Sequence, residues 1–263
     1  MSKKTKNILT AIIFYAVYIA IWKLLPKFSD FQFLNFLIGY IIMTFILLGM
    51  LWYTKKLDIL KFDSKKFFKG LKTGRGLIII AIILLAAGIT KNLNDGNAFV
   101  PIIKIICFVV AICLGTGFCE ETLYRGVIQN LMYDTFERKT RKGVMLSVII
   151  TALMFGAMHL GNFTDTGWSS VAQFFSTIGM GLVLGAIYAR CKSMWSVIFI
   201  HGFWDMCLMT DSGLFGIGKA LEGANNSKEL ATQFTSGIFV LIVMILVFLF
   251  LLRKKKENEY IEK

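Results

Sequence analysis

Residues 117–125 read GFCEETLYR and place Glu120, Glu121 and Arg125 inside an apolar segment. A charge at the centre of a membrane helix costs about 2.5–3.5 kcal/mol on insertion scales, so such groups predict a functional site. In a helix, Glu121 and Arg125 lie one turn apart and can pair, whereas Glu120 points about 100° away from Glu121. The spacing therefore gives Glu121 and Arg125 an orienting role and leaves Glu120 for general-base chemistry. The alternative is an ion-pair cluster that only fixes helix packing.

The rest of the chain is too apolar for a soluble domain. Of its 263 residues 56% are hydrophobic and only two are prolines, and the mean hydropathy is +0.68. A run of about 20 apolar residues crosses a bilayer as a helix. The sequence therefore predicts an all-α, polytopic transmembrane helical bundle of about eight spans. The expected spans are 8–25, 31–53, 76–90, 99–133, 144–160, 171–189, 194–210 and 234–252.

The formal net charge of +13 comes from basic residues that cluster between the apolar runs. An excess of Lys and Arg marks the cytoplasmic loops of membrane proteins, so this charge needs no nucleic-acid partner. An eight-span chain with these clusters on one side has both termini in the cytoplasm. The expected location is the plasma membrane, in a multi-pass protein of bacterial type, with the lipid bilayer as a partner. The basic clusters lie at 3–6, 55–75, 138–142, 190–192 and 253–256.

Residues 54–75 alternate lysines with leucine, isoleucine and phenylalanine. A basic helix with one apolar face lies on a membrane surface, where it contacts anionic headgroups. We therefore expect a surface-bound amphipathic helix in this segment, and the alternative is a plain solvated loop.

The chain has two histidines, His159 and His201, and both lie in apolar runs. Asp205 follows His201 by one helical turn and is placed to orient its imidazole. Counted from the cytoplasmic helix ends at 1.5 Å per residue, Glu120 lies about 20 Å deep, His159 about 25 Å and His201 about 10–13 Å. Helix tilts must therefore close the gap if these groups share a site, and their convergence is a hypothesis.

Three motifs occur in order on separate spans: EExxxR at 120–125, FxxxH at 155–159 and HxxxD at 201–205. This set resembles the CPBP (Abi) family, which includes type II CAAX prenyl endopeptidases and bacteriocin-immunity relatives. The resemblance covers residues 100–210, approximately the span of a predicted core at 99–210. Two further regions are predicted outside it. Residues 1–98 form N-terminal transmembrane helices with a basic cytoplasmic loop, and residues 211–263 form an extracytoplasmic loop, the last helix and a basic tail. CAAX-processing members usually end the third motif in Asn, so Asp205 leaves the substrate class open.

The resemblance implies an intramembrane endopeptidase of the metalloprotease-like kind. Glu120 would be the general base with His159 assisting, and His201 and Asp205 would bind a metal or stabilise the oxyanion. Glu121 and Arg125 would hold the architecture. Zinc held by His159 and His201 is compatible with this donor set, and so is metal-free chemistry in which imidazoles act on water and oxyanion. No HExxH helix occurs to decide between them.

The resemblance implies a peptide precursor or a membrane-associated protein as the substrate, in peptide maturation or bacteriocin self-immunity. The alternative is a non-catalytic immunity or regulatory binding protein of the same fold. A transporter is the third class, and the sequence disfavours it because no internal repeat or broken-helix signal is evident.

Overall fold

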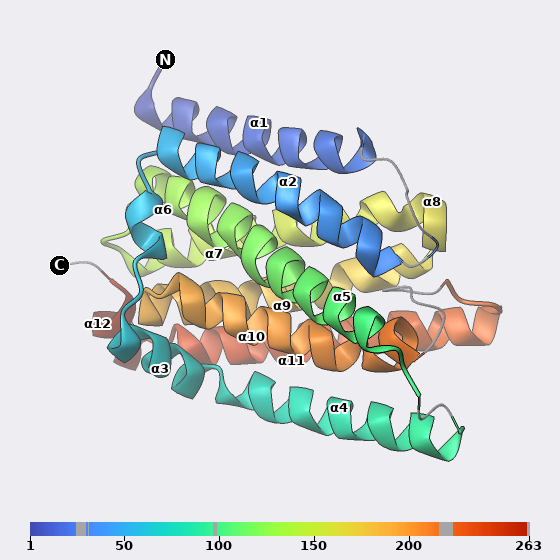
Figure 1. Ribbon diagram of the computed structural model, residues 1–263. Helices are drawn as coiled ribbons and strands as arrows, with labels where there is room; N and C mark the ends of the chain where they lie inside the picture. Colours follow the sequence, from blue (N-terminus) through green and yellow to red (C-terminus); the bar gives the residue numbers. More distant parts are fainter. Residues whose placement is uncertain (25–29, 31, 97–98, 216–222, 262–263) are drawn as a thin grey trace. The chain divides into compact units, whose positions relative to one another are not determined.

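The computed structural model describes residues 1–24, 30, 32–96, 99–215 and 223–261 (Figure 1). Every element within these ranges is a helix, which confirms the predicted all-α class. Seven of the helices are long and apolar enough to cross a membrane. The remaining predicted span, 194–210, corresponds to α10, which has 15 residues. Among the described residues, six of the seven contain α1 (Lys3–Leu24), α2 (Gln32–Tyr53), α4 (Arg75–Asn94), α7 (Arg141–His159), α9 (Ser169–Cys191) and α11 (Ser227–Leu251), and the seventh is Ile102–Phe136. The shorter α10 is Met194–Leu208.

The segment that carries the glutamate pair is a continuous apolar helix of 35 residues, Ile102–Phe136. Its first part, α5 (Ile102–Ile112), and its last part, α6 (Asn130–Phe136), are α-helical. Between them the chain forms two π-helical runs, η2 (Cys113–Glu120) and η3 (Thr122–Gln129). A π-helix bonds residue i to i+5, so the α-helical spacing assumed for Glu121 and Arg125 does not hold here. Wide turns of this kind occur frequently at functional sites.

By contacts the chain divides into two compact units. Unit 1 comprises Met1–Tyr15, Tyr124–Lys192 and Glu222–Lys263, and unit 2 comprises Ala16–Leu123 and Ser193–Leu221. The three sequence-based domains stay a prediction, because these units group residues by contact and not by function.

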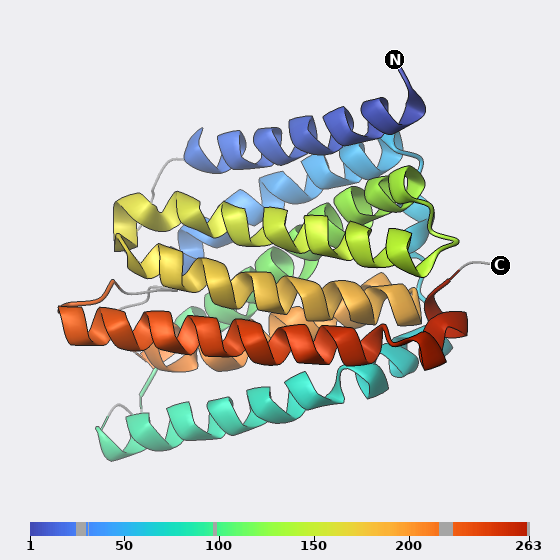
Figure 2. The same ribbon diagram turned by 180° about the vertical axis from the view of Figure 1, so that it is seen from behind.

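Unit 1 is built on α7, α9 and α11, which lie side by side in Figure 2. Two glycines let these helices approach closely. A Cβ at Gly181 of α9 would lie 3.0 Å from Ala152 of α7, and one at Gly237 of α11 would lie 2.5 Å from the Ala172 carbonyl oxygen of α9. Small residues at such contacts are typical of membrane helix packing.

Unit 2 packs α10 against η2 and α4, and α2 against α5 and η2 (Figure 1). Gly117 of η2 lies against Gly202 of α10. A Cβ at Gly117 would lie 3.1 Å from the Ile198 carbonyl oxygen and 3.5 Å from the Gly202 Cα. A glycine at 117 therefore lets these two backbones lie close together without a shift of the Ile198 carbonyl.

The basic segment 54–75 contains two short helices, η1 (Leu57–Leu60) and α3 (Ser64–Thr73). The Asp63 carboxylate caps α3 by accepting a hydrogen bond of 3.0 Å from the Lys66 backbone N–H. Phe68 is exposed beside the lysines, whereas Phe67 packs against Phe199 of α10 within unit 2. The segment is therefore helical and amphipathic, and its place on a membrane surface stays a prediction.

Two predicted polar loops are shorter than expected. α4 continues to Asn94 because Asn92 hydrogen-bonds the Gly88 carbonyl oxygen at 2.8 Å, so its polar side chain is satisfied within the helix. α11 begins at Ser227, where Asn226 caps it by accepting from the Glu229 N–H at 2.9 Å. The loop predicted to reach residue 233 was therefore placed too far along the chain. Residues 97–98 and 216–222 of these loops lie outside the described residues.

The remaining short elements connect or end the long helices. They are η4 (Leu160–Asn162), α8 (Phe163–Thr166), η5 (Thr210–Phe215), η6 (Lys254–Lys256) and α12 (Glu257–Tyr260).

Candidate active site

Unit 2 joins Glu121 to His201. The Glu121 Oε1 lies 2.7 Å from the His201 Nδ1, and both side chains are almost wholly buried. Because a carboxylate only accepts, His201 donates from Nδ1. Hydrogen bonds that involve an ionised group are about twice as strong as neutral ones. The bond therefore fixes both the ring orientation and the nitrogen that faces away from Glu121.

That second nitrogen of His201 faces Asp205. The Nε2 lies 3.4 Å from the Asp205 Oδ2, one helical turn along α10, as the sequence spacing predicts. The Thr116 hydroxyl of η2, which donates to the Ile112 carbonyl oxygen at 3.1 Å, lies close to the Asp205 carboxylate. His201 therefore lies between the carboxylates of Glu121 and Asp205. Thr116 of η2 lies close to the second of them.

The π-helical geometry and the glycine contact together bring these groups within reach. Gly117 lies about one turn before Glu121 in the helix that carries the glutamates, and Gly202 directly follows His201 in α10. A larger residue at Gly117 would press on the Ile198 carbonyl oxygen and push η2 and α10 apart. The short distance between Glu121 and His201 thus depends on the backbone contact next to it.

Glu120 is buried in η2, with 6% of its surface exposed. Its charge acts on His201 and on two buried tyrosines, Tyr18 and Tyr40. The Tyr40 ring covers Gly115 of η2 so closely that a Cβ there would lie 2.0 Å from the ring. Within unit 2 the charge of the predicted general base therefore acts on two tyrosine hydroxyls and one imidazole.

His159 belongs to unit 1, where it ends α7. Its Nδ1 lies 3.0 Å from the Phe155 carbonyl oxygen, and its ring meets the Phe155 ring edge-on at 5.1 Å. A carbonyl oxygen only accepts, so the proton sits on Nδ1 and Nε2 is the basic nitrogen of the neutral ring. The FxxxH spacing therefore serves to orient an imidazole.

Arg125, also in unit 1, is fully buried. Its Nη2 donates to the Gly181 carbonyl oxygen at 3.1 Å, and its guanidinium carbon lies 5.2 Å from the Phe155 ring centroid. The arginine therefore braces the residue that holds His159. Glu121 belongs to unit 2, so its pairing with Arg125 stays a prediction.

The predicted site residues thus fall into two groups. Unit 2 brings Glu121, His201 and Asp205 into direct contact with Glu120 beside them. Unit 1 holds Arg125 and His159, linked through Phe155. The convergence of all six residues on one site stays a prediction.

A zinc site needs three or more suitable ligands around one point. Among the described residues, no group of three or more His, Cys, Asp or Glu is arranged to hold a metal ion. Within unit 2 the His201 Nδ1 is held by Glu121, which leaves Nε2 and the Asp205 carboxylate as donors. This unit taken by itself therefore does not fit a zinc site.

The sequence did not reveal Thr116 or Tyr40 as parts of the site. Thr116 lies four residues before Glu120, a helical spacing that offers a weak signal. Tyr40 lies 79 positions before Cys119, whose Sγ donates to its carbonyl oxygen at 3.5 Å. No local pattern could have found a partner at that separation.

Comparison with known proteins matches residues 102–207 to the family model described as "Type II CAAX prenyl endopeptidase Rce1-like". This match contains all three motifs and confirms the predicted resemblance over these residues. The chain is also similar to the UPF0177 protein YvdC of Lactococcus lactis subsp. lactis (strain IL1403), with 24% identity over 186 residues. That alignment covers 67% of this chain and 66% of the relative, so the chain spans just under two thirds of the relative's length.

Proposed function

We propose that this chain, a member of the type II CAAX prenyl endopeptidase Rce1-like family over residues 102–207, is an intramembrane endopeptidase. The observation that carries the proposal is the contact of the His201 ring with Glu121 and Asp205 beside the buried Glu120. Buried ionisable groups are expensive in a membrane and usually mark function. A purely structural ion pair would not need a carboxylate at each end of one imidazole.

In the proposed mechanism Glu120 removes a proton from a water molecule, and the hydroxide attacks the carbonyl carbon of the substrate peptide. His159, with Nε2 as its basic nitrogen, assists Glu120 in holding that water. When protonated, the Nε2 of His201 donates a hydrogen bond to the oxyanion that forms. The proton on Glu120 then passes to the leaving amine as the C–N bond breaks.

Glu121, Asp205 and Arg125 act through these groups. Glu121 keeps the Nδ1 proton of His201 in place, so that Nε2 is the atom presented to the substrate. Asp205 orients the same ring from the other side. Arg125 braces Phe155, which fixes the orientation of His159.

Zinc dependence is a separate proposal, and it requires His159 to join His201 in one ligand shell. If zinc is bound there, it supplies a Lewis acid for the carbonyl. A chelator should then abolish cleavage and added Zn²⁺ should restore it. Cleavage that persists at high chelator concentration would contradict zinc dependence and favour the metal-free mechanism.

We further propose a peptide precursor or a membrane protein as the substrate, and the plasma membrane of a bacterium as the location. The test compares peptide fragments in membranes that hold the wild-type protein or the Glu120→Ala variant. Fragments specific to wild type support the enzyme. If the two membranes yield the same fragments at equal protein levels, a non-catalytic immunity or regulatory protein of the same fold becomes the better explanation.

A further inference from the structure

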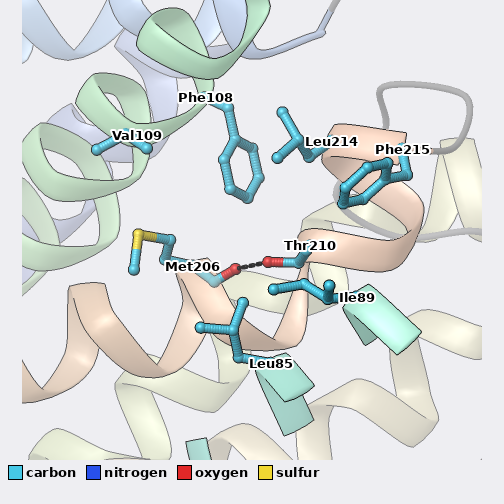
Figure 3. Close-up of a pocket in the computed structure, with 8 residues that line it drawn as sticks. All are labelled: Leu85, Ile89, Phe108, Val109, Met206, Thr210, Leu214 and Phe215. Carbon is cyan, nitrogen blue, oxygen red and sulfur yellow. Dashed lines mark hydrogen bonds between the residues drawn. The ribbon is translucent and has the colours of Figure 1, made fainter. Parts of the chain in front are cut away.

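An apolar cavity of about 230 Å³ lies in unit 2, one residue beyond Asp205 on α10 (Figure 3). Four elements converge on it, and all belong to the same unit. Its lining includes Leu85 and Ile89 from α4, Phe108 and Val109 from α5, Met206 from α10 and Leu214 from η5.

The cavity offers no polar group to an occupant. Its one polar lining residue, Thr210, donates its hydroxyl proton to the Met206 carbonyl oxygen at 2.7 Å, as the dashed line in Figure 3 shows. Burying a polar ligand group here without a partner would cost several kcal/mol, roughly 2–7 by transfer scales. The occupant must therefore be apolar.

The size of the cavity limits that occupant further. An engineered apolar cavity of about 150 Å³ binds benzene, so this one accepts a side chain as large as leucine or phenylalanine. A full acyl chain, which extends through about half of a 30 Å hydrocarbon core, is too long for it.

Two walls of the cavity, α4 and η5, are joined to each other. Asp211 of η5 bonds the Lys91 Nζ at 2.6 Å and the Asn92 Nδ2 at 2.7 Å, both on α4. These bonds tie the α4 wall to the η5 wall. The cavity is therefore pre-formed rather than opened by its occupant, which is typical of ligand sites.

Its position relates it to the candidate site. Met206 follows His201 by five residues, which is about 7.5 Å along α10. An extended peptide advances about 3.3–3.6 Å per residue, so a side chain held at Met206 lies about two residues from a peptide bond at His201.

We propose that this cavity is a specificity subsite that receives one large apolar side chain of the substrate, about two residues from the bond that is cut. The inference rests on the proposed function, because the occupant is taken to be part of a substrate. It assigns a role in substrate binding to α4 and η5, neither of which carries one of the three sequence motifs.

The test fills the cavity and leaves the lipid face unchanged. Val109→Trp places a large ring in the cavity, and Val110→Trp on the neighbouring exposed position is its matched control. Leu85→Trp with exposed Ile83→Trp as its control repeats the comparison on α4, in case one helix does not tolerate the change. The probes are Lys-flanked apolar peptides of about 20 residues, long enough to span a bilayer, in which Ala, Leu or Phe is scanned through each position.

Wild type and both controls should prefer Leu or Phe over Ala at one position by about 10-fold or more in kcat/KM, since each methylene in such a pocket contributes about 10–200-fold. Each cavity variant should lose that preference, so that its kcat/KM for the Leu and Phe peptides falls to its own value for the Ala peptide. If the cavity variants keep the preference of their controls, the subsite inference is overturned.

A second measurement separates this inference from the proposed function. A peptide with photoreactive leucine at the scanned position is cross-linked to protein that carries Glu120→Ala, so that binding is read without turnover. Cross-links should map to α4, α5 and η5, and should disappear with Val109→Trp but not with Val110→Trp. If wild type cleaves none of the peptides while this pattern is present, the endopeptidase proposal fails and the binding site stands. Equal cross-linking in the two variants overturns the site.

Discussion

The Glu121 carboxylate and the His201 imidazole, 80 positions apart in the chain, meet at 2.7 Å in the interior of unit 2. The sequence predicts an orienting role for Glu121 but names Arg125 as its partner. Within its own unit Glu121 contacts His201, and its pairing with Arg125 stays a prediction. The two glutamates of the EExxxR motif are therefore expected to fail in different ways when they are changed.

Glu121→Gln should destabilise the protein. The substitution replaces a charge-assisted hydrogen bond, worth about 1.5–3 kcal/mol, with a weaker one from the His201 Nδ1–H to a neutral amide oxygen. Glu120→Gln should unfold at nearly the wild-type temperature and lose cleavage, because it removes only the proposed base. Thermal unfolding of the purified protein, measured beside cleavage, tests both statements. Identical yield, melting and activity in the two variants would refute the division of roles.

The contact between η2 and α10 leads to a second prediction. Gly117→Ala should cost about 1–3 kcal/mol and reduce cleavage, because the new Cβ meets the Ile198 carbonyl oxygen at 3.1 Å and moves α10 away from Glu121. Gly49→Ala in α2 is the matched control, since nothing lies within 4 Å of its Cβ position. Alanine there should be neutral or stabilising by up to about 1 kcal/mol. If Gly117→Ala behaves like the control, the close contact does not position the site.

The C-terminal segment of unit 1 predicts a response to acid. Burial alone would raise the pKa of Glu259, but hydrogen bonds from Lys256 and Arg190 lower it from its ordinary value of 4.5 to about 2. A carboxyl whose folded pKa is depressed contributes stability above its unfolded pKa and loses it as the pH falls. The docking of α12 should therefore weaken between pH 4.5 and about pH 2.

Proteolysis of the tail, measured across this pH range with an acid-stable protease, reports the docking. Glu259→Gln should expose the tail at every pH and remove the transition. Glu257→Gln changes a neighbouring carboxyl and should keep it. If the acid transition persists in Glu259→Gln, another titrating group causes it.

The sequence predicts well whatever depends on local pattern. The span positions follow from apolar run length, and the contact between His201 and Asp205 follows from helical spacing. The contact between Glu121 and His201 does not follow, because it depends on a π-helical segment and on one glycine contact between distant helices. Neither the choice of a wider helix nor the packing of Gly117 on Gly202 leaves a periodic signal.

The sequence does not predict the apolar cavity either. Leu85, Val109 and Met206 are ordinary members of apolar runs, and any of them could face lipid. Only the fold shows that they share a space. The loop boundaries failed for a related reason, since Asn92 and Asp211 satisfy each other across two elements and let α4 continue.

The last prediction concerns His159 and His201, which belong to different units and must act on one substrate if the proposed chemistry is right. Groups that act as one catalytic unit give losses that do not add. His159→Ala and His201→Ala should each remove most of the activity, and the double variant should be hardly worse than either. Two histidines with separate structural roles would instead lower stability independently, by amounts that add. Single-turnover cleavage and thermal unfolding of all four proteins form the complete cycle. Additive losses that follow the melting temperature would contradict a shared site and leave two packing residues.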